Sequence, residues 1–364
     1  MRTNTTRARN HSGGFSLLEL LVSMAVGLVL LAGATRLFSD ASRVSYLVAQ
    51  RGEMQQNARA VINSMVRDLS LAGTGLPLGG IALPTGNGSS ASKFNCDQTG
   101  TCYTAPNNNF PNQHFYAAIP GPTAGPIVTG RTTDVVTLAY TDTSLLLNQC
   151  PLAAITAAGD QITVGACMTN PPAGTPGFND PAVGVKVGDV LMLQNANGAA
   201  VGTVTSVSAN GNIGFANGDW LNINQSGAAA GSITKSLSNP GAPGTYPPLG
   251  TTAIRVLLIT YFIQLPPGGA GPRMMRQVNA QSPVPIAENI ENLQVFYDIF
   301  NDGTGAESSN LPGANNLPNQ IRKVDAAVTA RTALQQWQPG AGFQRITLAT
   351  SVSPRNLSFH DRYQ

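Results

Sequence analysis

Glu19 places a carboxylate inside the longest apolar run of the chain, "GFSLLELLVSMAVGLVLL", and this position calls for a chemical explanation. A charged side chain at membrane depth costs roughly 2.5–3.5 kcal/mol, so it usually has a function and a partner. A cut between Gly14 and Phe15 would create a positive α-amine four residues before Glu19, and residues at that spacing are neighbours on one helical face. The positive partial charge at a helix amino terminus would favour the same carboxylate. These residues predict an ion pair that proteolysis creates, within one chain or between two.

The residues around this run indicate a membrane-targeting segment. Phe15–Thr35 is almost uncharged, and the residues before it include three arginines and no acid: Arg2, Arg7 and Arg9. As a helix, this segment would span about 31 Å, which is enough to cross the hydrocarbon core of a membrane. The positive flank is expected to stay in the cytoplasm, so the rest of the chain is expected to lie outside it.

An ordinary secretory signal is the alternative interpretation of the same segment. The small-x-small pattern at Ala32–Ala34 would direct cleavage before Thr35 and remove the apolar helix. The core of such a signal gains nothing from a buried charge, however. Glu19 therefore favours cleavage before Phe15, which leaves the helix on the mature chain.

The apolar positions after Arg36 recur at gaps of three and four, which predicts an amphipathic helix. The apolar stripe consists of Val44, Leu47, Val48, Ala58, Val61, Ile62, Met65 and Leu69. Polar residues are assigned to the other faces: Gln55, Gln56, Asn57, Arg59, Asn63, Arg67 and Asp68. Gly73 suits a carboxyl cap and Pro77 follows it, so we expect one helix from Phe15 to about Ala72 whose second half packs on a sheet. Two separate helices are the alternative.

The rest of the chain predicts strands joined by hairpins and long loops. Runs that alternate or are rich in β-branched residues lie at 134–141, 187–194, 200–208, 255–264, 293–300, 321–330 and 343–352. The "NANG" sequence between the second and third runs predicts a hairpin turn. One long helix followed by these strands predicts an α+β fold with a largely antiparallel sheet.

The four cysteines form two local pairs in the sequence. If the body is exported, Cys96–Cys102 and Cys150–Cys167 are the natural disulfides, because each would close a local loop in an oxidising compartment. Four unpaired, partly buried thiols are the alternative. Neither pair has the spacing of a familiar zinc site.

Composition and motifs argue against several functions. Removing the three arginines before Gly14 takes the formal net charge from +3 to zero, so the body gives no support for electrostatic binding of nucleic acid. The sequence contains no GxSxG, HExxH or phosphate-loop motif, and its histidines, His11, His114 and His360, are scattered. We therefore expect neither an enzyme nor a cofactor.

One acidic segment, "YDIFNDGTGAE", has two interpretations. Asp298, Asn301, Asp302 and Glu307 could supply oxygen ligands to calcium. Phe300, however, stands where an EF-hand would have an oxygen ligand, and Asn-Asp-Gly is equally a turn between two strands. The turn is the favoured interpretation, so no metal site is predicted here.

The segment "GGFSLLELLVSMAVGLVLL" closely resembles the class III signal of type IV pilins and type II secretion pseudopilins. The resemblance implies that a prepilin peptidase cuts after Gly14 and methylates the new amine of Phe15. It also implies that Glu19 pairs with that amine as subunits stack in a filament. Further segments resemble PilW-type minor pilins, relatives of the J-type minor pseudopilins: "QQNARAVINSMVRDLSLAG", "VGDVLMLQNANGAAVGTVTSV", "ITYFIQ", "RMMRQV", "IAENIENLQVFYDIF" and "SVSPRNL".

This resemblance implies a pilin-like α+β fold in four parts. They are a leader at 1–14, the transmembrane half of the helix at 15–35, its amphipathic half at 36–72, and a periplasmic or extracellular β-rich head at 73–364. It also implies an inner-membrane protein with a single span, a cytoplasmic amino terminus and a periplasmic head, which later moves to the pilus at the cell surface.

The function that the resemblance implies is that of a minor pilin in a priming or tip complex of a type IV pilus. Its expected partners are other minor and major pilins, the prepilin peptidase, the inner-membrane assembly platform and, before assembly, membrane lipid. Two alternatives stay open. The chain could be a J-type minor pseudopilin of a type II secretion system, or the filament could deliver its head as an adhesin or binding module.

Overall fold

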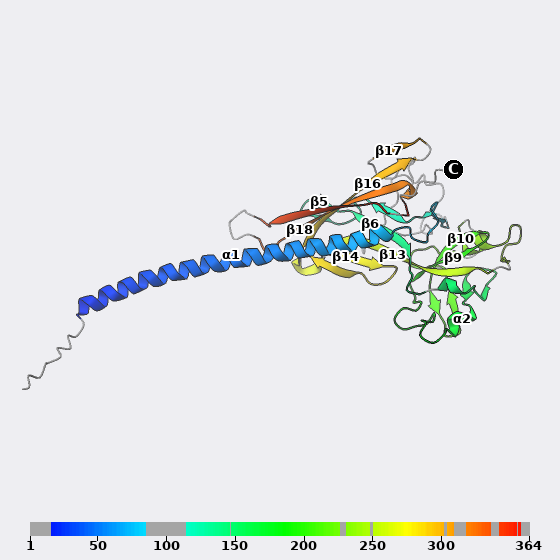
Figure 1. The fold of residues 1–364 in the computed structure, drawn as a ribbon, viewed down its shortest axis with the longest axis horizontal. Helices are drawn as coiled ribbons and strands as arrows, with labels where there is room; N and C mark the ends of the chain where they lie inside the picture. Colours follow the sequence, from blue (N-terminus) through cyan, green and yellow to red (C-terminus); the bar gives the residue numbers. More distant parts are fainter. Residues whose placement is uncertain are drawn as a thin grey trace, which may run out of the picture. The chain divides into compact units, whose positions relative to one another are not determined.

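The computed structural model describes residues 16–84, 114–145, 147–225, 231–247, 250–301, 304–308, 318–335, 342–354 and 356–357. The chain divides into two compact units, Met1–Glu53 and Met54–Gln364. The boundary between the units falls inside the long helix α1, Leu17–Leu71 (Figure 1). The second unit, which we call the head, contains the end of this helix and every strand within the described residues.

Helix α1 confirms the prediction of one long helix, and the alternative of two separate helices is wrong. It ends where the sequence indicated, because Gly73 adopts the left-handed conformation with φ 82°. The Gly73 N–H donates to the carbonyl oxygen of Ala139 at 2.9 Å, which ties this end of the helix to the sheet. A glycine takes this conformation without the steric cost that a side chain would add.

Among the described residues, one sheet has seven strands, two sheets have four and two have two. The strands of the seven-stranded sheet are β3 (Ala118–Gly121), β6 (Val135–Thr141), β9 (Val190–Asn195), β10 (Gly198–Thr203), β13 (Thr252–Gln264), β14 (Arg273–Val278) and β15 (Val284–Glu288). The long strand β13 pairs with β9 along its first part, with β14 along its last part, and with β6 on its other edge. Each of these pairs is antiparallel.

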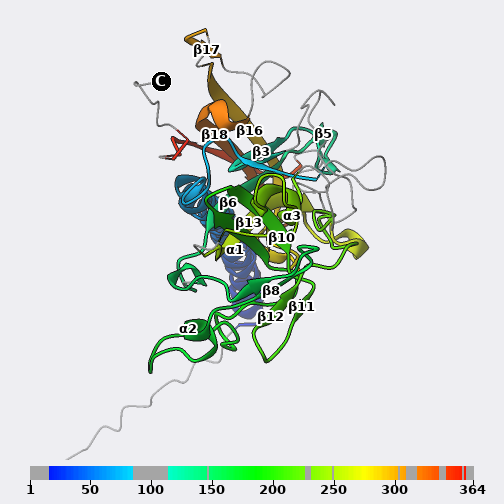
Figure 2. The same cartoon turned by 90° about the vertical axis from the view of Figure 1, so that its right-hand side faces the viewer.

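A four-stranded antiparallel sheet has the order β17–β16–β18–β19. Its strands are β16 (Ile290–Asn301), β17 (Ala306–Ser308), β18 (Ile321–Arg331) and β19 (Arg345–Val352). The second four-stranded sheet is small and consists of β7 (Ala154–Ile155), β8 (Gln161–Thr163), β11 (Ser206–Val207) and β12 (Asn212–Gly214); it lies near helix α2 in Figure 2.

The remaining elements are short. The two-stranded sheets are β1 (Ile81–Ala82) with β2 (His114–Phe115) and β4 (Ile127–Val128) with β5 (Arg131–Thr132). The short helices are α2 (Ala166–Thr169), α3 (Ile233–Leu237) and the 3-10 turns Leu147–Gln149, Pro267–Gly269 and Pro318–Gln320. With these elements the structure confirms the predicted α+β class.

The hairpin predicted at "NANG" is present as β9–β10, with Asn195 opposite Gly198. The single strand predicted at 200–208 is wrong, because its residues belong to β10 and β11 in two different sheets. The side chain of Asn224 receives a hydrogen bond from the N–H of Thr203 at 2.8 Å and donates one to its carbonyl at 2.6 Å. These bonds fix the end of β10 at the point where the chain leaves the sheet.

Two buried carboxylates connect parts of the head that lie far apart in the sequence. Asp134 accepts the N–H of Thr123 at 2.9 Å and that of Val295 at 2.8 Å, which joins the start of β6 to β16. Burial raises the pKa of Asp134 more than these two bonds lower it.

The other buried carboxylate, Asp142, accepts a hydrogen bond from Nε of Arg255 at 2.7 Å. Arg255 also forms an ion pair with Asp189 at 3.4 Å. Burial alone would raise the pKa of Asp142, but the hydrogen bonds from Ser144 and Arg255 give it a lowered pKa. This charge cluster fixes the start of β13 to the segments that follow β6 and precede β9.

Candidate functional site

Two side chains, those of Ser16 and Glu19, cap backbone N–H groups at the start of α1. The Ser16 hydroxyl accepts the N–H of Leu18 at 3.2 Å, and the Glu19 carboxylate accepts the N–H of Ser16 at 3.4 Å. This arrangement is a capping box, in which a serine and a glutamate three residues later satisfy N–H groups that the helix leaves unpaired. This role of Glu19 was not predicted from the sequence, although the spacing S-x-x-E is its signal.

The predicted cleavage site lies outside the described residues, since the description begins at Ser16. The structure therefore places Glu19 but not Gly14 or Phe15. In either form of the chain, the Ser16 N–H remains available to Glu19, because a cut before Phe15 leaves the bond between Phe15 and Ser16 intact. The capping role is thus compatible with the predicted ion pair to the new amine.

The helix beyond this cap exposes apolar side chains on all its faces. Leu17, Leu28, Val29, Leu37 and Phe38 are each exposed by between 63% and 80%. By length and composition, α1 is apolar enough to cross a membrane, and none of its most apolar window is buried.

Two hydroxyl groups in this segment are satisfied inside the helix. Ser23 donates to the Glu19 carbonyl at 2.6 Å, and Thr35 donates to the carbonyls of Leu31 and Ala32, each at 3.0 Å. Hydrocarbon cannot hydrogen-bond to polar groups, so these internal bonds suit a helix surrounded by lipid. The Glu19 carboxylate is the only charged side chain in the described part of this segment, Ser16–Thr35.

Comparison with known proteins identifies this segment. Residues 9–35 match the prokaryotic N-terminal methylation motif, and this range includes Gly14, Phe15 and Glu19. Over 60 residues the chain is 38% identical to the pilin-like protein PilA3 of Thermus thermophilus. The amino-terminal segment of this chain therefore carries a prepilin-type methylation motif, and the chain is similar over a short stretch to a pilin-like protein.

This similarity is confined to a small part of both chains. The alignment with the Thermus protein covers 16% of this chain and 26% of that protein. No solved structure matches the chain. The long helix and the antiparallel strands that follow it in the sequence nevertheless give the α+β architecture that the resemblance implied. The apolar helix with this motif is consistent with membrane anchoring.

Within the head, the end of the pilin-like helix packs on the seven-stranded sheet (Figure 1). Met54, Ala58, Val61, Met65 and Leu69 are buried there, at the spacing of a single helical face. The predicted stripe is therefore confirmed from Ala58 onward, and Met54 extends it by one residue that was not predicted. The prediction that Val44 and Val48 begin this packed face is wrong, because each side chain is about 60% exposed.

The prediction that Asp68 lies on a polar face of the helix is wrong. Asp68 is 2% exposed and lies on the buried face, three residues after Met65 and four before Ala72. Its carboxylate accepts hydrogen bonds from Tyr140 at 2.9 Å and from Tyr261 at 2.6 Å. The spacing of the stripe could have revealed this position, but its charge argued for the surface.

Arg276 completes this cluster, which we call the Asp68 cluster: Asp68, Tyr140, Tyr261 and Arg276. Its Nε lies 2.8 Å from the Asp68 carboxylate, so α1 is held at one point to β6, β13 and β14. Burial and the nearby carboxylate raise the pKa of Tyr140 and Tyr261. Burial would lower the pKa of Arg276, but Asp68 raises it more. The raised pKa values mean that both tyrosines and Arg276 keep the protons that they donate to Asp68 at neutral pH.

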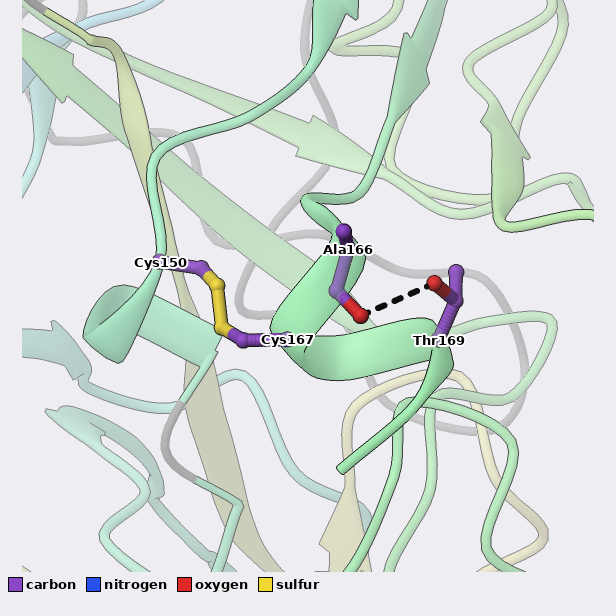
Figure 3. Close-up of a disulfide and its surroundings, with 4 residues drawn as sticks. All are labelled: Cys150, Ala166, Cys167 and Thr169. Atoms are coloured by element: carbon purple, nitrogen blue, oxygen red, sulfur yellow. Dashed lines mark hydrogen bonds between the residues drawn. A yellow bond between two sulfur atoms is a disulfide. The ribbon is translucent and has the colours of Figure 1, made fainter. Parts of the chain in front are cut away.

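A disulfide joins Cys150 to Cys167, the second pair expected from the sequence, with 6.3 Å between the Cα atoms (Figure 3). Cys167 belongs to the short helix α2, in which the Thr169 hydroxyl donates to the Ala166 carbonyl at 3.0 Å, and Cys150 follows the 3-10 turn Leu147–Gln149. Gly165 precedes this helix, and a Cβ atom there would collide with the carbonyl oxygen of Pro151. The pair Cys96–Cys102 lies outside the described residues.

The acidic segment considered for calcium contains the hairpin β16–β17, in which Phe300 lies opposite Glu307 and Asn301 opposite Ala306. Asp298 forms an ion pair with Lys323 at 3.1 Å, and Asp302 lies outside the described residues. Within the described ranges, no group of three or more His, Cys, Asp or Glu side chains is placed to hold a metal ion.

Proposed function

We propose that this chain is a minor pilin of the PilW type, which acts by assembling into a type IV pilus rather than by catalysis. The observation that supports this most is the exposed apolar helix that follows a prepilin-type methylation motif. Burying apolar surface contributes about 25 cal/mol per Å², so a helix exposed on all faces needs lipid or other helices around it. Lipid would cover it before assembly, and neighbouring pilin helices afterwards.

In this proposal the peptidase cuts between Gly14 and Phe15 and methylates the new amine. Glu19 then has two partners, the Ser16 N–H in its own helix and the amine of the same or the next subunit. The uncut protein has its amino terminus in the cytoplasm and its head in the periplasm. The size of the head, with its long loops, suits a priming or tip complex better than a shaft of many closely packed copies.

Mass spectrometry of the mature amino terminus tests the processing step. We expect a chain that begins with N-methylated Phe15. A chain that begins at Thr35 would remove the membrane helix, and the proposed assembly mechanism with it.

Three substitutions separate the two roles of Glu19. Glu19→Gln keeps an oxygen that can accept the Ser16 N–H, since glutamine also serves in a capping box, but it removes the charge. Ser16→Ala removes the hydroxyl cap and keeps the charge. We expect Glu19→Gln and Glu19→Ala to be processed and stable in the membrane but absent from pili, and Ser16→Ala to assemble.

The readout is the amount of each variant in sheared pili relative to the membrane fraction. Normal incorporation of Glu19→Gln would show that the charge pair is dispensable. If Ser16→Ala were also lost from pili, capping of the helix would be the role of this pair of residues.

A further inference from the structure

A cavity of about 320 Å³ opens where the hairpin β4–β5 meets the four-stranded sheet. Side chains from β16, β18 and β19 line it on the sheet side, and Thr129 and Arg131 line it on the hairpin side. The cavity lies entirely in the head, far along the sequence from the pilin-like segment. The proposed assembly through helix α1 does not involve this cavity.

Glu291 lies in the wall of this cavity because of a β-bulge. Ile290 pairs with Ala330 and Asn292 with Thr329, so Glu291 is the extra residue between two registered pairs. Bulges of this kind redirect a side chain and are common beside functional sites. Glu291 is only 5% exposed, and Arg345 donates to its Oε1. Its other oxygen, Oε2, is buried and has no hydrogen-bond partner among the described residues.

The positive charges around Glu291 exceed its single negative charge. Arg331 and Arg345 lie directly opposite each other on β18 and β19, an arrangement that is unfavourable for like charges. The Arg331 guanidinium lies 4.0 Å from the centre of the Phe343 ring, and its Nε is buried without a partner in the described part of the chain. Arg131 adds a third positive charge at the exposed rim. Glu291 can neutralise only one of the three.

The remaining wall offers neutral hydrogen-bonding groups. Asn292, Thr129, Thr329 and Thr347 line the cavity, and the last two share a hydrogen bond of 2.9 Å between their hydroxyls. Thr129 has φ 49°, a conformation that is rare for a β-branched residue and that tends to be kept at functional sites.

These groups define the chemistry of a complementary ligand. A simple anion such as acetate has no donor to offer to Glu291, and a simple cation would be repelled by the arginines. The unpartnered Oε2 calls for a donor, which a hydroxyl group can supply, while the excess of arginine calls for a carboxylate. A ring of hydroxyls would also use the threonines and Asn292, which donate and accept.

We propose that this cavity binds an acidic sugar residue, a hexuronate, whose hydroxyl groups donate to Glu291 and whose carboxylate is held by Arg131 and Arg345. The proposal goes beyond assembly, because it gives the head of the pilin-like protein a ligand of its own. It does not depend on the type of pilus or on cleavage between Gly14 and Phe15.

Calorimetric titration of the mature full-length chain in detergent micelles tests this, with D-glucuronate as the probe. D-glucose lacks the carboxylate, acetate lacks the hydroxyls, and L-glutamate carries carboxylates without a ring of hydroxyls, so these three serve as comparison ligands. We expect saturable binding of glucuronate at millimolar concentration and binding of each comparison ligand weaker by about tenfold or more, the factor that 1.4 kcal/mol gives.

Two variants locate the site. Arg131→Ala lies on the exposed rim, so it should fold normally and weaken glucuronate binding by about tenfold. Arg273→Ala removes an exposed arginine elsewhere in the head and is the matched control, for which we expect unchanged binding. Glu291→Gln, checked for an unchanged thermal unfolding profile, should also weaken binding.

Binding of glucose or glutamate as tight as that of glucuronate would overturn the proposal, because it would mean that the ligand class is wrong. Equal affinities of the wild type and Arg131→Ala would place the ligand elsewhere. The absence of saturable heat with glucuronate would show that water alone occupies the cavity.

Discussion

Asp68→Asn removes the negative charge from the Asp68 cluster while keeping the size of the side chain. The variant leaves the Arg276 guanidinium without its carboxylate, in a position where its side chain is 26% exposed. It also replaces an acceptor of two tyrosine hydroxyls with an amide that can accept at one atom only. The expected result is a less stable head in which the end of α1 is held less firmly to the sheet.

The expected loss of unfolding free energy follows from the burial of the ion pair Asp68–Arg276. Removing one partner of a buried ion pair costs about 3–5 kcal/mol, because the other charge stays buried without compensation. Arg276 is partly exposed and can recover some hydration, so we expect a loss of about 3 kcal/mol, at the lower end of that range. In the double variant Asp68→Asn with Arg276→Met, the unpaired charge is gone, and part of the loss should be recovered.

Urea unfolding of the mature chain in detergent, followed by circular dichroism, measures these differences if the slope of the transition stays constant. Glu288→Gln is the control, since it breaks the exposed pair Arg273–Glu288 and should cost less than about 1 kcal/mol. A loss below about 1 kcal/mol for Asp68→Asn would refute the reasoning. So would a double variant that is no more stable than the single one.

Three further predictions concern the rest of the head. The pKa of Asp142 is lowered from 3.8, because its hydrogen bonds outweigh burial, so its ionised form stabilises the fold above that pH. The difference in unfolding free energy between the wild type and Asp142→Asn should therefore shrink as the pH falls below 3.8, and a constant difference in urea titrations at each pH would contradict this. Reducing the disulfide Cys150–Cys167 should cost about 3 kcal/mol in urea unfolding, since it closes a loop of sequence separation 17; no change with reductant would contradict this. Thr129→Gly should raise the thermal unfolding temperature by relieving a strain of about 1 kcal/mol in the hairpin loop, and a lower temperature would show that the threonine side chain contributes more than its strain costs.

The elements with the strongest periodicity were predictable from the sequence. The helix expected from Phe15 to about Ala72 is observed at Leu17–Leu71, because caps and apolar spacing are local properties. The strand expected at 255–264 begins earlier, at Thr252, where it pairs with β9. Strands β14 and β15 were not predicted, because arginine, methionine and proline are weak strand signals and these segments become strands by pairing along β13.

The candidate sites also differ in how far the sequence could predict them. The order of Gly14, Phe15 and Glu19 in an apolar run was enough to predict a prepilin-type segment, because these residues are close together in the sequence; all three lie within residues 9–35, which match the methylation motif. Even the capping role of Glu19 could have been inferred from its distance to Ser16. No local pattern indicated where the charges of the head would find their partners.

Only the tertiary structure decided those partners. Asp68 and Arg276 are separated by 208 residues in the chain, and Glu291 and Arg345 by 54. The pairing of distant strands determines which side chains meet, and a bulge of one residue determines which way Glu291 points. The sequence by itself thus determined the segment suited to enter a membrane, since that depends on a contiguous apolar helix. The fold decided which of the charges are buried, because burial depends on contacts between segments that lie far apart in the chain.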